Sequence, residues 1–293
     1  MRVGVIDVGS NTARLLVARV SRSTFVPVGR ERAVLSLGEE VERTGRISDI
    51  KLARLAAQCE EFVRTAGALG ASQVRVVVTA PGRQAENREA LISTLRHATG
   101  LGVRVLSPEE EGMLAFTGAV TCAERVQDPV AVCDVGGGST EVVVGTTDGG
   151  AAYVRAVGIG SLRLACRTLS YERPSKRELA RARGEVEAAF DRFLVPLPKS
   201  ALATGGTARA LRRMVGRTLE PDALDAALRL LRRCDADQIV QVFGVPPHRV
   251  RFLAAGTLIL NEVYRRLGVP LNVARGGLRE GAALELLGQL EAA

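Results

Sequence analysis

A glycine-rich hairpin that occurs twice constrains the fold of this chain more than any other feature. Asp7 to Thr12 reads DVGSNT after a buried-strand pattern, and Asp134 to Thr140 reads DVGGGST after a second such pattern. At a constant offset of 127 residues, the aliphatic strands that follow the two turns also coincide. We interpret this coincidence as a duplicated β-β-β-α-β-α unit, with two unrelated hairpins as the alternative.

Changes in hydrophobic period predict the elements around the two hairpins. The first half is expected to hold strands at residues 1–9, 12–20, 24–37, 74–79 and 103–106, and helices at 48–69, 85–99 and 108–120. The second half is expected to hold strands at residues 129–135, 140–146, 200–203 and 271–274, and helices at 162–169, 175–193, 206–215, 221–233, 248–267 and 278–290. This pattern predicts an α/β chain with domains at 1–122 and 123–293, whose last helix, at 278–291, packs back on the first domain.

The length and apolar content of the chain suit two ordinary cores, since 46% of its 293 residues are hydrophobic. No run approaches the roughly 18 apolar residues that a membrane span requires, and Met1 to Arg14 resembles a strand more than a signal peptide. We therefore expect a cytoplasmic protein without a membrane partner. Five cysteines without a C-x-x-C pair, and two histidines far apart, argue against disulfides, zinc and histidine catalysis.

The net charge of +8 comes from the second half of the chain. Residues 159–279 hold 22 basic and 11 acidic side chains, whereas residues 1–158 hold 18 of each. Such a field attracts polyanions, although a compositional preference for arginine would give the same excess. Aromatic residues make up only 3% of the chain and tryptophan is absent, so no nucleic-acid partner is expected.

The glycine-rich turns also have the chemistry of phosphate-binding sites. Glycine lets backbone N–H groups approach phosphate oxygens, and the neighbouring hydroxyls add donors. A third turn, Gly205 to Thr207, opens an expected helix and offers its N-terminal amides to an anion. Each turn alone is compatible with ordinary hairpin or helix-start chemistry, and the repeat favours the phosphate interpretation. The candidate phosphate ligands are Ser10, Asn11, Thr12, Gly136, Gly137, Gly138, Ser139, Thr140, Gly205, Gly206 and Thr207.

Carboxylates are the candidates for activating water, because histidine is scarce. Glu109, Glu110 and Glu111 open the helix expected at 108–120, a position where acidic residues commonly only stabilise the helix N-terminus. Arg83 follows the strand at 74–79 and is placed either to grip a phosphate or to be solvated. An aspartate at the end of a strand, as at both hairpins, is suited to hold a metal ion.

Taken together, the pattern resembles the exopolyphosphatase and guanosine pentaphosphate phosphohydrolase (Ppx/GppA) family. The resemblance implies a short, two-domain form of the actin-like, ribonuclease H-like (ASKHA) fold with a substrate cleft between the domains, and a homodimer. It rests on Ile6 to Thr12, Leu37 to Glu39 with Thr44-Gly45, Thr79 to Asn87, Glu110-Glu111, Asp134 to Glu141, Gly160 to Leu164, Ala203 to Ala210 and Gly277 to Gly281.

The same resemblance implies roles for individual residues. Glu111, which directly precedes the small Gly112, matches the family's catalytic base. Mg²⁺, with Mn²⁺ as the alternative ion, is implied at Asp134, Glu141 and Asp7, and Arg83 joins the phosphate ligands named above. The chain departs from the family pattern at Glu40, at Pro81-Gly82 and from Ala274 to Gly277, but none of these changes removes a proposed catalytic residue.

Four functions follow from this pattern. The first is an exopolyphosphatase, in which a Glu111-activated water attacks the terminal phosphorus of inorganic polyphosphate. The second is hydrolysis of guanosine pentaphosphate to the tetraphosphate. The third is a regulatory protein that binds polyphosphate or an alarmone without hydrolysing it, and the fourth is a small-molecule kinase. Aromatic residues are scarce, and the candidate ligands are all suited to bind phosphate groups. Both observations favour the first function.

Overall fold

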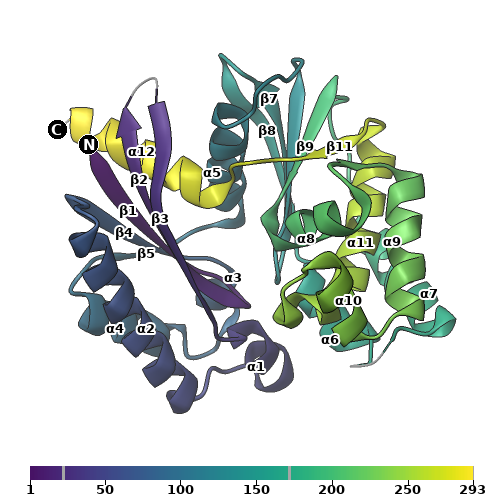
Figure 1. Ribbon diagram of the computed structural model, residues 1–293, viewed down its shortest axis with the longest axis horizontal. Coiled ribbons are helices and arrows are strands. Elements are labelled where there is room, and N and C mark those ends of the chain that lie inside the picture. The colour runs from purple at the N-terminus through teal and green to yellow at the C-terminus, as the bar shows by residue number, and fades with distance from the viewer. Residues whose placement is uncertain (22–23, 171–172, 293) are drawn as a thin grey trace.

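Two mixed β-sheets, one in each half of the chain, organise the structure (Figure 1). The computed structural model describes residues 1–21, 24–170 and 173–292. In the first sheet β1 and β2 are antiparallel, as are β2 and β3, and β4 and β5 run parallel to β1. This sheet has the order β3-β2-β1-β4-β5, formed by β1 (Arg2–Val8), β2 (Thr12–Ser21), β3 (Thr24–Val34), β4 (Gln73–Val78) and β5 (Val103–Val105).

The second sheet repeats the topology of the first. Its order β8-β7-β6-β9-β11 matches that of the first sheet strand for strand, and β10 adds an edge. In both hairpins the same turn bond closes the loop: Gly9 N–H donates to Thr12 O and Gly136 N–H donates to Ser139 O, each at 3.0 Å. The predicted duplication is therefore confirmed. The strands are β6 (Val130–Val135), β7 (Thr140–Thr146), β8 (Gly150–Val157), β9 (Ser200–Thr204), β10 (Thr218–Leu219) and β11 (Leu271–Val273).

Helices cover both faces of the first sheet. On one face α2 (Asp49–Ala68) and α4 (Arg88–Thr99) bury Phe62 and Leu91 against Ile6 and Leu15. On the other face α12 (Leu278–Ala292) packs its leucines and alanines on the remaining aliphatic residues of β1 and β2. The side chain of Ser48 accepts a hydrogen bond from Lys51 N–H, as expected for the cap of α2.

The second sheet is covered in the same way. On one face α5 (Pro108–Thr121) buries Phe116 and Ala119 against Val132 and Val143. The larger core lies on the other face, where most of the remaining helices pack. These helices are α6 (Ser161–Thr168), α7 (Lys176–Ala189), α8 (Gly205–Val215), α9 (Pro221–Arg233), α10 (Ala236–Phe243) and α11 (Pro247–Leu267).

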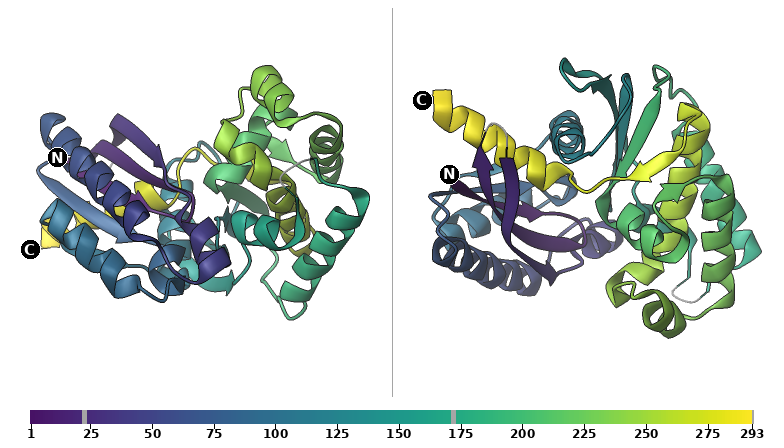
Figure 2. Two further views of the ribbon diagram at one scale, coloured as in Figure 1. Left: turned by 90° about the horizontal axis from the view of Figure 1, so that it is seen from below. Right: turned by 45° about the horizontal axis from the view of Figure 1, so that its top comes forward.

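The chain crosses between the halves twice, and the two crossing helices lie side by side. Figure 2 shows α12, in yellow, leaving the second half and lying along the first sheet. Its backbone contacts that of α5 so closely that a Cβ atom at Gly281 would lie 1.9 Å from the carbonyl oxygen of Leu114. Only glycine permits this approach. α5 precedes the domain boundary expected at residues 122 and 123, yet it packs on the second sheet. That boundary therefore stays a prediction.

Several short elements escaped the sequence pattern. The strand expected to reach residue 37 ends at Val34, where the N–H groups of Leu35 and Ser36 donate to Asn11 O and turn the chain into α1 (Leu37–Thr44). The helix expected at 85–99 begins only at Arg88, as α4, because the side chain of Asn87 bonds to the backbone of Ile47; a separate short helix, α3 (Ala80–Gln84), precedes it. Within the described ranges, no helix is long and apolar enough to cross a membrane.

Candidate active site

A cavity of about 100 Å³ lies between the two sheets, where β1 and β6 end. We call it the cleft. Both halves line it, and the residues come from the hairpins, from the start of α8 and from the crossings at α5 and α12. The lining includes Asp7, Gly9 to Thr12, Arg14, Thr79, Ala80, Glu111, Asp134 to Ser139, Thr204 to Gly206, Arg209, Arg249 and Gly277 to Glu280.

The two hairpin turns face each other across the cleft and touch. A Cβ atom at Gly137 would lie 2.8 Å from Cβ of Ser10, so the second turn needs glycine at this point to meet the first. The backbone N–H groups of Ser10, Asn11, Gly137 and Gly138 donate to no described residue. Free amides from both halves therefore converge on the cavity, as an anion site requires.

The third turn joins them at the N-terminus of α8. Gly205 adopts a φ of 88°, in the left-handed region, and a Cβ atom there would lie 2.7 Å from Oδ1 of Asp134. The guanidinium of Arg249 lies directly against Gly206, where a Cβ atom would come within 2.3 Å of its Cζ. Helix N-terminal amides and an arginine thus share one corner of the cleft.

Four arginines line the cleft, and we call Arg14, Arg209, Arg249 and Arg279 the arginine quartet. Within the described part of the chain, none of the four lies within ion-pair distance of a carboxylate. Burial lowers the pKa of Arg14 and Arg209, and neighbouring guanidinium groups add to the effect. Burial and the charge of Arg209 lower the pKa of Arg249 to about 10. Crowded positive charges of this kind require an anion.

The sequence analysis did not assign a role to the quartet. Its members come from β2, α8, α11 and α12; Arg209 and Arg279 lie within motifs of the family resemblance, but no role was assigned to them. One signal was available. Arg14 lies 127 residues before Glu141 and therefore occupies the repeat position of that glutamate, an exchange of charge in otherwise matching hairpins.

The three consecutive glutamates of α5 have three different environments. Glu109 is exposed, and Glu110 forms a capping box in which its carboxylate accepts from Ser107 N–H at 2.7 Å while Ser107 Oγ accepts from Glu110 N–H. Glu111 is buried and lines the cleft. Burial raises the pKa of Glu111 to about 7; the carboxylate of Asp134 adds to the rise and the guanidinium of Arg83 opposes it.

Arg83 lies beside the cleft and contacts Glu111 directly. Its Nη1 donates to Oε2 of Glu111 at 3.0 Å and to the carbonyl oxygen of Leu106 at 2.6 Å, and its Nη2 donates to Ser139 Oγ at 3.3 Å. Arg83 therefore orients Glu111 and links it to the second hairpin, although it was expected to act as a phosphate ligand. Pro81 and Gly82 precede Arg83 within α3, which begins at Ala80.

Three further carboxylates are the candidates for holding a metal ion. Asp7 and Asp134 line the cleft, and burial raises the pKa of each. Glu141 is buried behind Gly112, and neither of its carboxylate oxygens has a hydrogen-bond partner among the described residues. Burial and the charge of Glu111 raise its pKa well above the usual range. A buried carboxylate whose oxygens have no hydrogen-bond partner, such as that of Glu141, calls for a cation.

The described residues do not form a complete metal cage, since no three acidic, histidine or cysteine side chains converge as ligands. Mg²⁺ does not require one, because it commonly binds through one or two carboxylates and completes its shell with water and substrate phosphate. The donor set of Asp7, Asp134 and Glu141 therefore fits Mg²⁺.

Two expected phosphate ligands lie away from the cleft. The hydroxyl of Thr140 donates to the carbonyl oxygen of Ile159 at 2.7 Å, which closes the second hairpin on the chain that enters α6. Thr207 is buried on α8 and packs against Gly256 of α11. The other hairpin and turn residues lie where the sequence placed them.

Comparisons with known proteins show which family of sequences this chain resembles. The sequence model of the Ppx/GppA phosphatase family matches residues 16–290. The chain is 29% identical to Exopolyphosphatase 1 of Mycobacterium tuberculosis, over 98% of this chain and 88% of the relative. It is 29% identical to Exopolyphosphatase 2 of the same organism, over 98% of this chain and 99% of the relative.

A solved structure gives the same result for the fold. The Ppx/GppA family member of Aquifex aeolicus superposes with a TM-score of 0.83 at 25% sequence identity, over 99% of this chain and 98% of that chain. The two sheets with their helices are accordingly two actin-like domains of the ASKHA fold, and the predicted fold class is confirmed.

Proposed function

Because this chain belongs to the Ppx/GppA phosphatase family, we propose that it is an exopolyphosphatase that releases orthophosphate from the ends of inorganic polyphosphate. One observation carries the proposal: four arginines without carboxylate partners in the described structure surround a cavity that also holds a buried glutamate of raised pKa. The arginines supply anion binding and the glutamate supplies a base, and these are the two functions that hydrolysis of a phosphoanhydride needs.

The size and lining of the cleft favour a phosphate-only substrate. Its volume of about 100 Å³ is well below the roughly 300–1,000 Å³ of pockets that enclose whole ligands, so it suits a terminal phosphoryl group and its water. No aromatic side chain is among the described residues that line it. A nucleobase would find no stacking partner there, which favours polyphosphate over guanosine pentaphosphate.

The role proposed for each residue follows from its position in or beside the cleft. The quartet and the free amides of the turns bind the oxygens of the terminal phosphoryl group and stabilise the charge that develops during transfer. Glu111 accepts a proton from the attacking water, and Arg83 holds the Glu111 carboxylate in place. The bond between the terminal phosphorus and its bridging oxygen breaks as the water oxygen attaches, and the shortened polyphosphate leaves.

The residues that would hold Mg²⁺ are Asp134 and Asp7, which line the cleft, and Glu141, which is buried near Glu111; burial raises the pKa of all three. When bound, a divalent ion supplies neutralisation of phosphate charge at the scissile group. Glu141 is the member whose carboxylate has most to gain, because neither oxygen has a hydrogen-bond partner in the described structure.

The proposal is tested by measuring orthophosphate release from long-chain polyphosphate, tripolyphosphate and guanosine pentaphosphate in parallel, with MgCl₂ and with EDTA. We expect release from polyphosphate that requires the divalent ion, with lower kcat/KM on the nucleotide. Turnover of guanosine pentaphosphate alone would contradict the proposal. Binding of polyphosphate without any release of orthophosphate would also contradict the exopolyphosphatase proposal, and would support a regulatory binding protein instead.

A further inference from the structure

The short helix α1 lies at the opposite side of the molecule from the two crossings. In Figure 1, α5 and α12 lie between the sheets at the top, and α1 lies at the bottom, where it contacts α6 of the second half. The covalent connections therefore join the halves on one side only. Closure on the other side depends on non-covalent contacts, among them those that α1 makes and the bond from Asn11 Nδ2 to the carbonyl oxygen of His248 at 3.4 Å.

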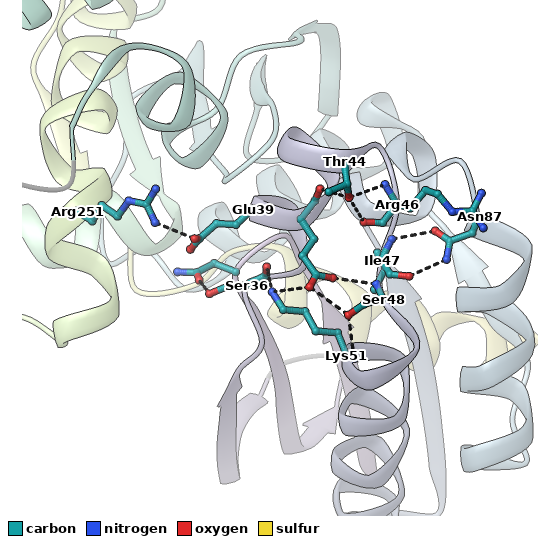
Figure 3. Close-up of polar contacts among 11 residues, drawn as sticks. Ser36, Glu39, Thr44, Arg46, Ile47, Ser48, Lys51, Asn87 and Arg251 are labelled. Carbon is teal, nitrogen blue, oxygen red and sulfur yellow. Dashed lines mark hydrogen bonds and ion pairs between the residues drawn. The ribbon is translucent and has the colours of Figure 1, made fainter.

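Two glutamates of α1 provide such contacts. The carboxylate of Glu42 accepts from Arg163 Nε and from Arg167, whose Nη2 lies 3.1 Å away, and its side chain is only 10% exposed. Glu39 accepts from Arg251 Nη1 at 2.7 Å, across the gap between α1 and α11 (Figure 3). All three arginines belong to the second half. Partly buried, charge-assisted hydrogen bonds of this kind are stronger than exposed ion pairs.

The backbone at the start of α1 also holds the first phosphate turn. Gly38 N–H donates to Ser10 O at 2.7 Å, and the N–H of Ser36 donates to Asn11 O at 3.0 Å. The hydroxyl of Ser36 adds a bond to Asn11 Oδ1 at 3.1 Å. Ser36 adopts a φ of 49°, a left-handed conformation that is uncommon outside glycine and that these bonds maintain.

The rest of α1 is fastened to the first half. Glu40 accepts from Ser48 N–H at 2.9 Å, and Lys51 Nζ donates to the carbonyl oxygen of Ser36 at 2.6 Å (Figure 3). A displacement of the second half relative to α1 would therefore be transmitted to the Ser10–Asn11 turn rather than absorbed within the helix.

We propose that α1 is an electrostatic latch, in which Glu39 and Glu42 hold the second half closed and thereby set the Ser10–Asn11 turn against Gly137. The two glutamates are positioning residues for the reaction, since neither lines the cleft. The activity measurements that follow rest on the proposed phosphohydrolase function, whereas the exchange measurement does not.

Weakening the latch should affect KM and kcat differently. Only the closed form brings both turns to one phosphoryl group, so the apparent affinity falls in proportion to the closed fraction. Saturating substrate draws the halves together again and restores turnover. A variant that merely misfolds in part would instead lose kcat at unchanged KM, because fewer molecules are active.

The test compares E39Q/E42Q with the wild type on long-chain polyphosphate with MgCl₂. We expect KM to rise about tenfold, the effect of removing two partly buried carboxylate charges at about 0.7 kcal/mol each, and kcat to stay within about twofold. The matched control is E60Q/E61Q, which removes two glutamates that pair with Arg64 on the exposed surface of α2, and which should leave both parameters unchanged.

Hydrogen–deuterium exchange provides a readout that does not depend on activity. Without substrate, the amides of residues 35–38 should exchange faster in E39Q/E42Q than in the wild type or in E60Q/E61Q. Unchanged KM, a loss of kcat alone, or unchanged exchange at residues 35–38 would overturn the latch. If the wild type releases no phosphate from any substrate, the proposed function fails, and the exchange result alone still decides the latch.

Discussion

At the scale of single residues, the ion pair between Arg83 and Glu111 is the contact that most affects the proposed chemistry. Burial raises the pKa of Glu111 to about 7, and the nearby positive charge of Arg83 keeps it from rising further. A general base must be deprotonated to accept a proton, so kcat/KM should increase with pH below about 7 and level off above it. The base is thus half ionised near neutral pH, where it remains a strong enough base to take a proton from water.

We predict that Arg83→Met moves this rising limb to higher pH by about one unit or more, because the variant loses the charge that lowers the pKa of Glu111. The measurement is the pH profile of kcat/KM. Arg104→Met is the matched control, since Arg104 pairs with the neighbouring Glu110 at 2.6 Å and should leave the limb in place. A limb that stays fixed, or moves to lower pH, in Arg83→Met would refute the assignment of Glu111.

The arginine quartet leads to a prediction about stability. Arg209→Gln removes one of four crowded positive charges and should raise Tm by about 2 °C in phosphate-free buffer, since less repulsion remains in the folded state. Added inorganic phosphate should raise the Tm of the wild type by neutralising the quartet, and should do so less in the variant. Arg212→Gln, an exposed change on the same helix, is the control and should alter neither result.

At this scale the sequence identified the residues of the turns but not those that meet only in space. Ser10 and Gly137 lie within local motifs, so their order along the chain was enough to predict them, whereas Glu111 was selected from three consecutive glutamates only through the family resemblance. The quartet is assembled from four separate elements, and no local pattern shows that its members meet. Arg83 and Glu111 were both named as candidates, but their contact across 28 residues could be recognised only from the structure.

At the scale of elements, α5 carries the base on its first turn, and the capping box of Ser107 and Glu110 fixes that turn. We predict that Ser107→Ala lowers the free energy of unfolding by about 1 kcal/mol and also lowers kcat, because the turn that holds Glu111 frays. Urea denaturation and steady-state kinetics measure the two effects. Ser175→Ala removes the equivalent cap of α7, away from the cleft, and should cost similar stability at unchanged kcat.

Equal losses of kcat in Ser107→Ala and Ser175→Ala would mean that the cap of α5 has no special relation to the base. The long elements around these caps were predictable, since α2, α5, α7 and α11 each span several turns of regular apolar spacing. The short elements were not. α1 follows a strand directly, and its eight residues offer too few apolar positions to reveal a helical period.

At the scale of the whole molecule, the contact between α5 and α12 joins the two halves. We predict that Gly281→Ala lowers the free energy of unfolding by about 2 kcal/mol or more, because the new methyl group would meet the carbonyl oxygen of Leu114 at 1.9 Å and separate the helices. Gly288→Ala on the same helix has open space around it and should stabilise the protein slightly. Urea denaturation compares them, and equal effects would contradict the close contact.

The overall architecture was predictable because the repeat conveys it. Two matching hairpins at a fixed offset imply two similar sheets, and the observed strand orders agree. Each crossing helix covers the sheet of the other half: α5 packs on the second sheet and α12 on the first. This exchange was not predictable, since no sequence pattern tells which sheet α5 covers. That exchange places Glu111 beside Glu141 of the second half while α12 brings Arg279 from the first-half side of the cleft.

The central claim is that Glu111 activates the water that attacks a terminal phosphate. Its most direct test is orthophosphate release from long-chain polyphosphate by the wild type, Glu111→Gln and Glu109→Gln, each with MgCl₂. We predict that Glu111→Gln lowers kcat by about 100-fold or more while the exposed control Glu109→Gln matches the wild type. Wild-type rates in Glu111→Gln would contradict the account.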